Sequence, residues 1–544
     1  MSDAIRFRRL AAIAVCLFSI AAFVSACGGS SSSNSSASGA SGGSSGSSSS
    51  SSASTGTPKS GGSITVLESA GFAGDWPAGL DPATNVNGAA DQTQMDAIYG
   101  ELWELTEGGK LRPDLATGYK FSDGGKTVTI TLRQGVKFSD GTPFNAQAVV
   151  TNWTRDLASP CTCKPVLPGK PVITAPDANT VQIKLGAPDG AFIDQLQDSN
   201  FSWIASPTAL KKMGEQAFKL KPVGAGPFTV VSDTLSNTLV LKKNPNYWES
   251  GKPYLDQLTV KTTAGDESAL EAIQAGQGNA YEGMSTRQLV NSFKSAGATV
   301  TQEPSTSPYD IQFNTKIPPF NDKRARLAIY YATNAALLDQ KLFGNQYPVT
   351  ESFTAPAGLF YEQKVPGYPE YDLAKAKALV KQLGGLNINY FTITQPQTQP
   401  MMVAMQQMWK EAGINASIHF YGLAQLIKQF AGPWQIAFQT AGAWDPGAGV
   451  GLGFRFLSQS PFSGVHDPKL DALILGAGGA VDPAVRKKLY DQAAAYIAQN
   501  AYGPFLFPIS GSNVAKGAQG PGLTTPIPSV AVNPQILWED VSAS

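Results

Sequence analysis

The clearest pattern of hydrophobic and polar positions lies in residues 121–153. Val128, Ile130 and Leu132 alternate with threonines, and a period of two residues is typical of a strand with one buried face. An Asp-Gly turn precedes this strand and another follows a second, short strand, after which Asn145 can cap a helix whose apolar face includes Trp153. We therefore predict a compact unit of strand, turn, short strand and capped helix.

Similar patterns along the rest of the chain predict helices and strands that alternate. Further strands are expected at 61–67, 180–185, 228–231, 238–242, 255–260, 309–313, 416–421 and 505–509. Further helices are expected at 91–105, 267–274, 322–338, 372–383, 401–413 and 483–499, with Asp372 and Asp482 as caps. Methionines at helical spacing between 401 and 408 indicate a pliable core face rather than a ligand surface. The interleaved elements predict an α/β fold.

The first 60 residues follow the pattern of an exported protein. Three arginines precede an apolar stretch at 10–23 that is too short to span a membrane as a stable helix, so residues 1–26 indicate a signal peptide. The sequence ending in Cys27, VSAC, resembles the bacterial lipobox, in which the cysteine is lipidated and becomes the first mature residue. Residues 27–60 are rich in serine and glycine, and we expect them to form a flexible tether.

The charge balance and the cysteine content limit which binding partners and bound metals the chain can have. The 544 residues contain 41 basic and 41 acidic side chains, so neither nucleic acid nor an acidic partner is indicated. Outside the export segment only Cys161 and Cys163 remain, and their spacing leaves both a local disulfide and free thiols open. The pair lacks the second half of a structural zinc site.

The sequence offers little material for catalysis. The only two histidines, His419 and His466, have no metal-binding spacing, and the glycine-rich stretches lack the frame of a phosphate-binding loop. His419 lies in an alternating run and is expected on the surface of a strand. We predict no catalytic residue, no metal site and no cofactor, and therefore a protein that is not an enzyme.

Residues 135–153, GVKFSDGTPFNAQAVVTNW, resemble the signature of extracytoplasmic solute-binding proteins of the peptide/nickel type, the receptors of ABC importers. GAGPFTVVSD, LVLKKNPNYW, IQFNTKIPPFNDKRARLAIYYA and DPKLDALI follow in the order of that family. The resemblance implies an α/β fold of two lobes that close about a hinge, with an extra subdomain inserted in the first lobe. It implies a first lobe at 61–93, 222–310 and 504–544, an inserted subdomain at 94–221, a second lobe at 311–503, and a hinge near 309–314 and 501–505.

The same resemblance implies that loops from both lobes enclose the ligand. The expected ligand-binding residues are Phe72, Trp76, Asn314, Phe353, Gln395, Gln397, Trp444, Asp445 and Phe454. Two roles stay open for Asp445, which follows Trp444 in a shortened loop: holding the ammonium group of a peptide, or closing a turn. For the phenylalanines and for Trp76, core packing is the alternative. Residues 395–400 contain no arginine, so recognition of a dipeptide carboxylate by an arginine is not implied.

Together with the lipobox, the resemblance implies a monomeric, lipid-anchored receptor on the outer face of the cell membrane, in the periplasmic space. It would capture peptides by hinge closure and deliver them to the permease and ATPase subunits of an ABC importer. The alternatives are a neutral solute such as an oligosaccharide, or a sensory role without transport. A secreted hydrolase is the least favoured hypothesis.

Overall fold

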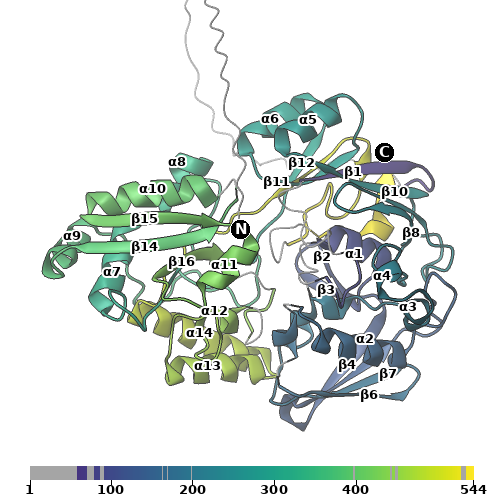
Figure 1. Cartoon of the computed structure of the whole chain (residues 1–544), viewed down its shortest axis with the longest axis horizontal. Coiled ribbons are helices and arrows are strands. Elements are labelled where there is room, and N and C mark those ends of the chain that lie inside the picture. The colour runs from purple at the N-terminus through teal and green to yellow at the C-terminus, as the bar shows by residue number, and fades with distance from the viewer. Residues whose placement is uncertain are drawn as a thin grey trace, which may run out of the picture. The chain divides into compact units, whose positions relative to one another are not determined.

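The computed structural model describes residues 58–69, 79–85, 91–161, 163–167, 169–197, 199–395, 398–440, 444–447, 451–528 and 535–544. All of them belong to one compact unit, Gly56–Ser544. The signal peptide and most of the tether expected from the sequence lie outside the described residues. Figure 1 labels most of the helices and strands of the described part.

A seven-stranded sheet, which we call the sheet of the first lobe, has the order β12-β17-β11-β1-β10-β9-β8. β1 runs parallel to β10 and β11, whereas the other neighbours are antiparallel. Ile64 and Val66 of β1 pack with α1 on one face, and Leu67 packs with α5 and α6 on the other. The elements are β1 (Ser63–Ser69), α1 (Gln92–Tyr99), β8 (Phe228–Thr234), β9 (Thr238–Lys243), β10 (Gln257–Thr263), α5 (Asp266–Gln274), β11 (Ala280–Met284), α6 (Val290–Ser295), β12 (Thr299–Gln302) and β17 (Ser512–Ala515).

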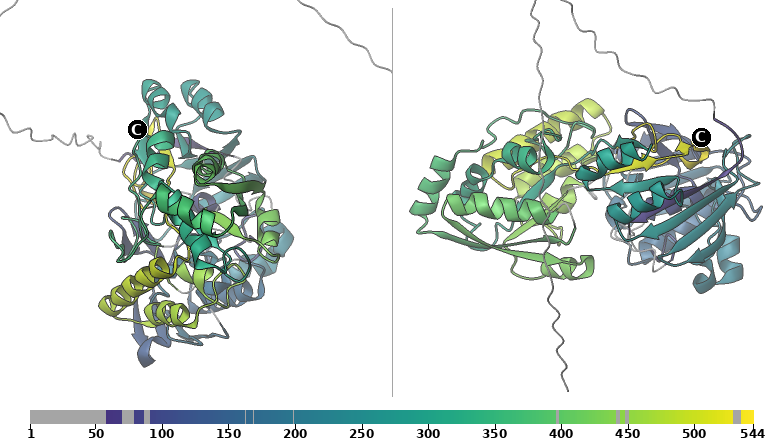
Figure 2. Two further views of the ribbon diagram at one scale, coloured as in Figure 1. Left: turned by 90° about the vertical axis from the view of Figure 1, so that its left-hand side faces the viewer. Right: turned by 90° about the horizontal axis from the view of Figure 1, so that it is seen from above.

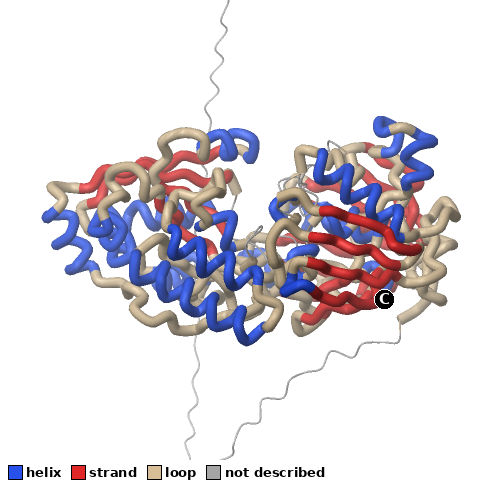
Figure 3. Tube along the Cα trace, turned by 90° about the horizontal axis from the view of Figure 1, so that it is seen from below, coloured by secondary structure: helices blue, strands red, loops and turns tan. Residues whose placement is uncertain are grey.

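The inserted region is built on a four-stranded antiparallel sheet of order β4-β5-β7-β6. Its elements are β4 (Ala116–Ser122), β5 (Thr127–Leu132), α2 (Ala146–Ala158), β6 (Val172–Asp177), β7 (Thr180–Lys184), α3 (Pro207–Met213) and α4 (Glu215–Phe218). One face of this sheet packs against α2, which contacts β6 and β7. In the view from below, the strands of this region are red and no helix lies in front of them (Figure 3).

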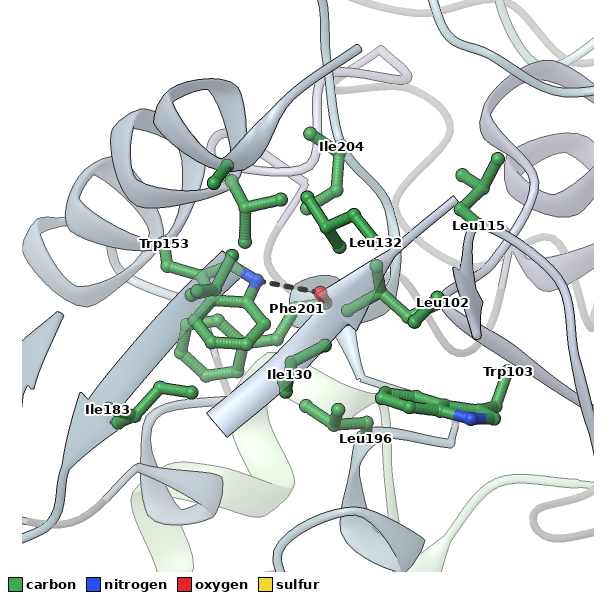
Figure 4. Packing of buried hydrophobic residues seen from close by; sticks show 14 of the residues in the cluster. Leu102, Trp103, Leu115, Ile130, Leu132, Trp153, Ile183, Leu196, Phe201 and Ile204 are labelled. Atoms are coloured by element: carbon green, nitrogen blue, oxygen red, sulfur yellow. Dashed lines mark hydrogen bonds between the residues drawn. The ribbon is translucent and has the colours of Figure 1, made fainter. Parts of the chain in front are cut away.

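The pattern at 121–153 predicted the alternating strand and the capped helix of this region correctly. Val128, Ile130 and Leu132 are at most 1 % exposed, and the Oδ1 atom of Asn145 accepts a hydrogen bond from the Ala148 amide at 3.0 Å. Trp153 is fully buried, and its Nε1 donates to the Phe201 carbonyl at 2.8 Å, as Figure 4 shows. The predicted short strand is reduced to a single bridge between Lys137 and Pro143.

The helix expected at 91–105 is wrong beyond residue 99. α1 ends at Tyr99 because Gly100 takes a positive φ of 63°, which breaks the helical path. The apolar residues that followed at helical spacing belong instead to a hairpin of β2 (Trp103–Thr106) and β3 (Lys110–Pro113). The pattern of apolar positions alone did not distinguish these two structures.

A second four-stranded sheet, the sheet of the second lobe, has the order β13-β16-β14-β15. Its elements are β13 (Tyr309–Phe313), α7 (Lys323–Ala332), α8 (Ala335–Phe343), α9 (Leu373–Gln382), β14 (Leu386–Ile393), α10 (Thr398–Glu411), β15 (Ile414–Tyr421), α11 (Leu423–Gln429) and β16 (Ile436–Thr440). Met401, Met402 and Met405 of α10 are fully buried, which confirms the core role of the methionine stripe. Figure 2 shows these green elements from two further sides.

The long helix expected at 322–338 is two helices. Thr333 leaves α7 with an extended backbone, at φ −101° and ψ 108°, and Asn334 then caps α8 by accepting a hydrogen bond from the Leu337 amide at 2.9 Å. The capping side chain makes it favourable for a new helix to begin at this point.

Three more helices complete the second lobe: α12 (Leu452–Phe456), α13 (Pro468–Gly479) and α14 (Pro483–Asn500). Asp482 caps α14 as predicted, accepting from the Ala484 amide at 2.8 Å. The strand expected at 505–509 is wrong, because only Phe505 makes a β-bridge, to Asp310. The chain then returns to the first lobe, ending in the short strands β18 (Ala518–Gln519) and β19 (Ser542–Ala543).

Two segments, 303–308 and 506–511, connect the sheets of the two lobes, and we call them the crossing segments. Glu303 N donates to Gly511 O at 3.2 Å between the two segments, and Tyr309 N, directly after the first segment, donates to Phe507 O of the second at 3.1 Å. The hinge predicted at 309–314 and 501–505 borders both segments, and its position stays a prediction, as do the domain boundaries.

Candidate functional site

The carboxyl ends of β1 and β11 place two glutamates side by side. Glu68 and Glu282 are register partners in these parallel strands, and each is only 3 % exposed. Glu303 directly follows β12, two strands further along the same sheet, and is completely buried. Because open α/β sheets bind ligands at the carboxyl ends of their parallel strands, this edge is the first half of the candidate site.

Neutral groups hold these three carboxylates in place. Gln94 Nε2 donates to Glu68 Oε2 at 2.7 Å, and Thr93 Oγ1 donates to Glu282 Oε2. The Ile527 amide donates to Glu303 Oε2 at 2.8 Å. Gln94 and Thr93 lie in the first turn of α1, so the start of this helix positions the carboxylates at the strand ends.

Burial raises the pKa values of these three glutamates. It raises the pKa of Glu68 well above its usual value, and the neighbouring Glu282 and Asp91 carboxylates raise it further. Burial also raises the pKa of Glu282 to about 7, and burial together with Glu282 raises that of Glu303. Near neutral pH the three side chains therefore retain protons that an exposed glutamate would have lost.

The loop that follows β16 in the second lobe supplies the other half of the candidate site. Trp444 is 4 % exposed and packs in a small apolar cluster with Leu105, Ile527 and Leu537. Gly109, in the turn between β2 and β3, lies so close that a Cβ atom there would be 2.5 Å from Trp444 Cη2. Trp444 therefore contacts residues that precede and follow the second lobe in the sequence.

Asp445 is fully buried and paired with a cation of its own lobe. Its carboxylate accepts hydrogen bonds from the guanidinium of Arg486, from Tyr490 Oη at 3.1 Å and from the Gly447 amide at 2.9 Å. The bond from Gly447 closes a tight turn, which is one of the two roles left open by the sequence. The other role, contact with a ligand ammonium group, stays a prediction.

Arg486 of α14 also connects the second lobe to the inserted region. Its Nη1 lies 3.3 Å from Asp194 Oδ2 and 3.3 Å from the Gly190 carbonyl, and the Gly190 amide donates to the Gly478 carbonyl at 2.8 Å. Burial lowers the pKa of Arg486, but the Asp445 carboxylate outweighs this and holds that pKa above its usual value. Arg486 therefore stays charged between two acidic residues.

A polar cluster lies at the start of the second lobe, next to the crossing segments. Gln312 Nε2 donates to the carbonyls of Arg455 and Phe462, both at 2.9 Å, and Gln439 Nε2 donates to Gln312 Oε1 at 2.8 Å. Burial raises the pKa of the neighbouring Asp310 to about 6, although Arg455 lowers it. These groups fix the end of β13 to the helix that carries Phe454.

The described residues predicted to bind ligand fall into separate groups within the second lobe. Phe353 and Asp445 both contact Tyr490, since the rings of Phe353 and Tyr490 are 6.0 Å apart, and Trp444 is adjacent in sequence. Asn314 and Phe454 border a different aromatic cluster: Asn314 Nδ2 donates to the Trp434 carbonyl at 2.9 Å.

Phe454 stacks on Phe462 with ring centroids 4.2 Å apart, and Phe462 contacts Phe430 of the cluster that contains Trp434. Gln395 accepts backbone hydrogen bonds at the start of α10. Phe353 is 3 % exposed, so it packs in the core of the second lobe in this structure. A ligand role for all of these residues stays a prediction.

Several predicted residues lie outside the described part: Phe72, Trp76, Gln397 and the lipidation site Cys27. For the remaining cysteines, the structure records a disulfide between Cys161 and Cys163, whose Cα atoms are 5.2 Å apart. Both cysteines are buried in the core of the inserted region.

Sequence reasoning missed the strand-end glutamates and Arg486. One signal was available for Glu68, because a charged residue at the carboxyl end of an otherwise apolar strand marks the edge at which α/β sheets bind ligands. Glu282 also ends a short apolar run, but its pairing with Glu68 depends on the strand register. Arg486 lies on a helix with charged neighbours, and no local pattern distinguishes it from Lys487.

The described residues contain no group of three or more His, Cys, Asp or Glu side chains arranged to hold a metal ion. Within the same ranges, no helix is both long enough and apolar enough to cross a membrane.

Comparison with known proteins assigns the chain to a class. The family described as "Bacterial extracellular solute-binding proteins, family 5 Middle" matches residues 110–460. The glutathione-binding protein GsiB of Shigella flexneri is 30 % identical over 362 residues, which cover 65 % of this chain and 70 % of that protein. GsiB of Salmonella typhi is 31 % identical over the same coverage. The chain therefore belongs to the family 5 bacterial extracellular solute-binding proteins.

Solved structures confirm the two-lobed α/β fold. The ABC transporter-associated periplasmic binding protein DppA of Helicobacter pylori, in complex with the peptide STSA, has a TM-score of 0.73 and 23 % identity, covering 89 % of this chain and 98 % of its own. The oligopeptide-binding protein AppA of Bacillus subtilis, in complex with a nonapeptide, has a TM-score of 0.70 and 19 % identity, covering 90 % and 100 %. The relatives bind solutes, which agrees with the prediction that the chain is not an enzyme.

Proposed function

We propose that this protein is the receptor of an ABC importer and that its ligands are peptides. The observation that carries the proposal is the arrangement of the two halves of the candidate site. The strand-end glutamates belong to the sheet of the first lobe, the Trp444–Asp445 loop follows the last strand of the second, and the paired crossing segments join the two sheets. Closure about such segments encloses a ligand when contacts from both lobes favour the closed state.

Peptides are the ligand class that the relatives favour. The curated relatives are named for glutathione, itself a small peptide, and the structures of two neighbours are complexes with peptides. The structure of a third neighbour, of similar fold, is a complex with agropinic acid, so a non-peptide solute is the competing hypothesis.

Native mass spectrometry of the protein purified from its own cells tests the ligand class. We expect the folded protein to carry extra masses that dissociate on activation and whose fragmentation yields peptide sequences. A bound sugar or opine-like acid instead would contradict the peptide proposal. Consumption of the bound compound by the purified protein would contradict the receptor proposal as a whole.

Variants of the second-lobe loop locate the site. Trp444→Ala is expected to lose the bound mass, because the indole packs between the second lobe and residues near the glutamate edge. Tyr371→Ala is the matched control, since this aromatic side chain is 44 % exposed in the same lobe. Equal retention of ligand by both variants would remove Trp444 from the site.

Membrane attachment and delivery are the remaining parts of the proposal. The lipobox ending in Cys27 and the Ser/Gly-rich tether support anchoring at the outer face of the membrane, with the folded body free to meet a permease. Deletion of the gene is expected to abolish uptake of labelled peptides, and complementation is expected to restore it. Normal uptake in the deletion strain would favour a sensory receptor.

A further inference from the structure

Three buried carboxylates lie along one edge of the first-lobe sheet, and none of them has a cationic partner among the described residues. Glu68 and Glu282 end neighbouring parallel strands, and the Glu303 amide pairs with Gly511 beside β17, which is itself the neighbour of β11. The three side chains are 3 %, 3 % and 0 % exposed. Glu282 is the central member, because its carboxylate acts on the pKa values of both Glu68 and Glu303.

When these side chains are ionised, hydrogen-bond acceptors exceed donors in this cluster. Each carboxylate receives one hydrogen bond from a neutral donor, as described above. Glu303 Oε1 and Gln94 Oε1 are buried and have no hydrogen-bond partner among the described residues. Buried polar atoms are normally satisfied, so these two oxygens indicate that a donor is missing from the cluster.

The second-lobe ion pair provides a contrast within the same molecule. Buried Asp445 has Arg486, whereas no Lys or Arg of the described part acts on Glu68, Glu282 or Glu303. Adjacent buried carboxylates without a cation are unfavourable when ionised, because burial and mutual repulsion both oppose the charge. A cation that enters the cluster reverses both effects.

We infer that Glu68, Glu282 and Glu303 form an acidic pocket that binds a cationic side chain of the peptide, either the ammonium group of a lysine or the guanidinium group of an arginine. This inference rests on the proposed function and specifies which peptides the receptor prefers. An ammonium or guanidinium group supplies several donors at once, which matches the surplus of acceptors. Metal binding is not favoured, because the described residues offer no metal-binding group.

Isothermal titration calorimetry with ligand-free full-length protein tests the pocket. The probes are Ala-Lys-Ala, its N-acetylated form, Ala-Gln-Ala and the free diamine cadaverine. We expect Ala-Lys-Ala to bind at least about tenfold more tightly than Ala-Gln-Ala, because the glutamine peptide leaves the carboxylates unpaired. Both peptides carry a terminal ammonium group, so a preference for Ala-Lys-Ala identifies the lysine side chain as the bound cation, and we expect the N-acetylated form to keep this advantage.

The variant Glu282→Gln removes the central charge while keeping the shape and an acceptor for Thr93. We expect it to abolish most of the preference for Ala-Lys-Ala over Ala-Gln-Ala, because the central carboxylate can no longer pair with the cation. Glu271→Gln, an exposed position on α5 in the same lobe, changes the net charge equally and should change neither affinity. An unchanged lysine preference in Glu282→Gln would overturn the inference.

Proton release gives a measurement on the unmodified protein. A cation favours the ionised carboxylates, so binding of Ala-Lys-Ala near pH 7 should release protons, seen as a heat that depends on the buffer. Asp91, which faces Glu68, can share in this release. Equal affinity for lysine and glutamine peptides would overturn the inference and leave the peptide receptor intact, whereas tight binding of cadaverine without binding of any peptide would overturn both. Failure of every peptide to bind would overturn the proposed function as well.

Discussion

Replacing Arg486 by methionine tests whether a buried ion pair stabilises the second lobe. The substitution keeps much of the side-chain volume but removes the only cation that contacts Asp445 in the described part of the chain. Asp445 is fully buried, so its carboxylate would keep only Tyr490 and the Gly447 amide as partners.

The magnitude follows from this geometry. Removing one partner of a buried ion pair typically costs about 3–5 kcal/mol, because the remaining charge is buried without compensation. The lost bonds from Arg486 to Asp194 and Gly190, each 3.3 Å long, lie at the weak end of hydrogen bonding and add little. We therefore expect Arg486→Met to lower the free energy of unfolding by about 4 kcal/mol. The double variant Arg486→Met/Asp445→Asn should recover about half of this loss.

Urea denaturation followed by circular dichroism measures these values. The matched control is Lys487→Met, the next residue of α14, whose ion pairs to Glu362 and Asp491 are about one-third exposed. Exposed pairs contribute about 0–1 kcal/mol, so the control should lie close to the unmodified protein. If Arg486→Met costs no more than Lys487→Met, or if the double variant is less stable than Arg486→Met alone, the reasoning is refuted.

Three further predictions concern other parts of the chain. Trp153→Ala should destabilise the inserted region by about 3–5 kcal/mol, since it removes a fully buried ring and the donor to Phe201; a cost below about 1 kcal/mol in urea denaturation would contradict this packing. Burial raises the pKa of Asp114 to about 7, so folding is favoured at low pH and loses this contribution as the pH rises through 7; Asp114→Asn should flatten the pH dependence of the denaturation midpoint, and an unchanged slope would exclude this group. Cys27→Ser should move the protein from the membrane to the soluble fraction on cell fractionation, whereas continued membrane attachment would exclude a lipid anchor there.

The sequence predicted local structure well wherever a short pattern determines it. The alternation at Val128, Ile130 and Leu132 and the caps at Asn145 and Asp482 were all correct, because strand faces and helix starts depend on neighbouring residues. The family signature is also a local pattern, and the family that it resembles has two lobes, so the two-lobed fold was predicted from it.

The candidate site depends instead on register and on contacts between distant segments. Glu68 and Glu282 become neighbours only because β1 and β11 pair in one register, and Ile527 reaches Glu303 from near the end of the chain. The helix expected at 91–105 failed similarly: the apolar spacing of its second half suited a helix, but a positive φ at Gly100 and pairing between β2 and β3 gave a hairpin.

The missing side chain at Gly109 determines how closely the hairpin turn and the Trp444 loop can approach. The residue has a φ of +68°, and a Cβ atom would lie 2.5 Å from the indole, well inside van der Waals contact. The absence of a side chain at position 109 thus allows the Trp444 loop to approach the hairpin turn this closely. A methyl group there would meet the Trp444 ring, so an alanine at position 109 would keep the turn and the Trp444 loop farther apart.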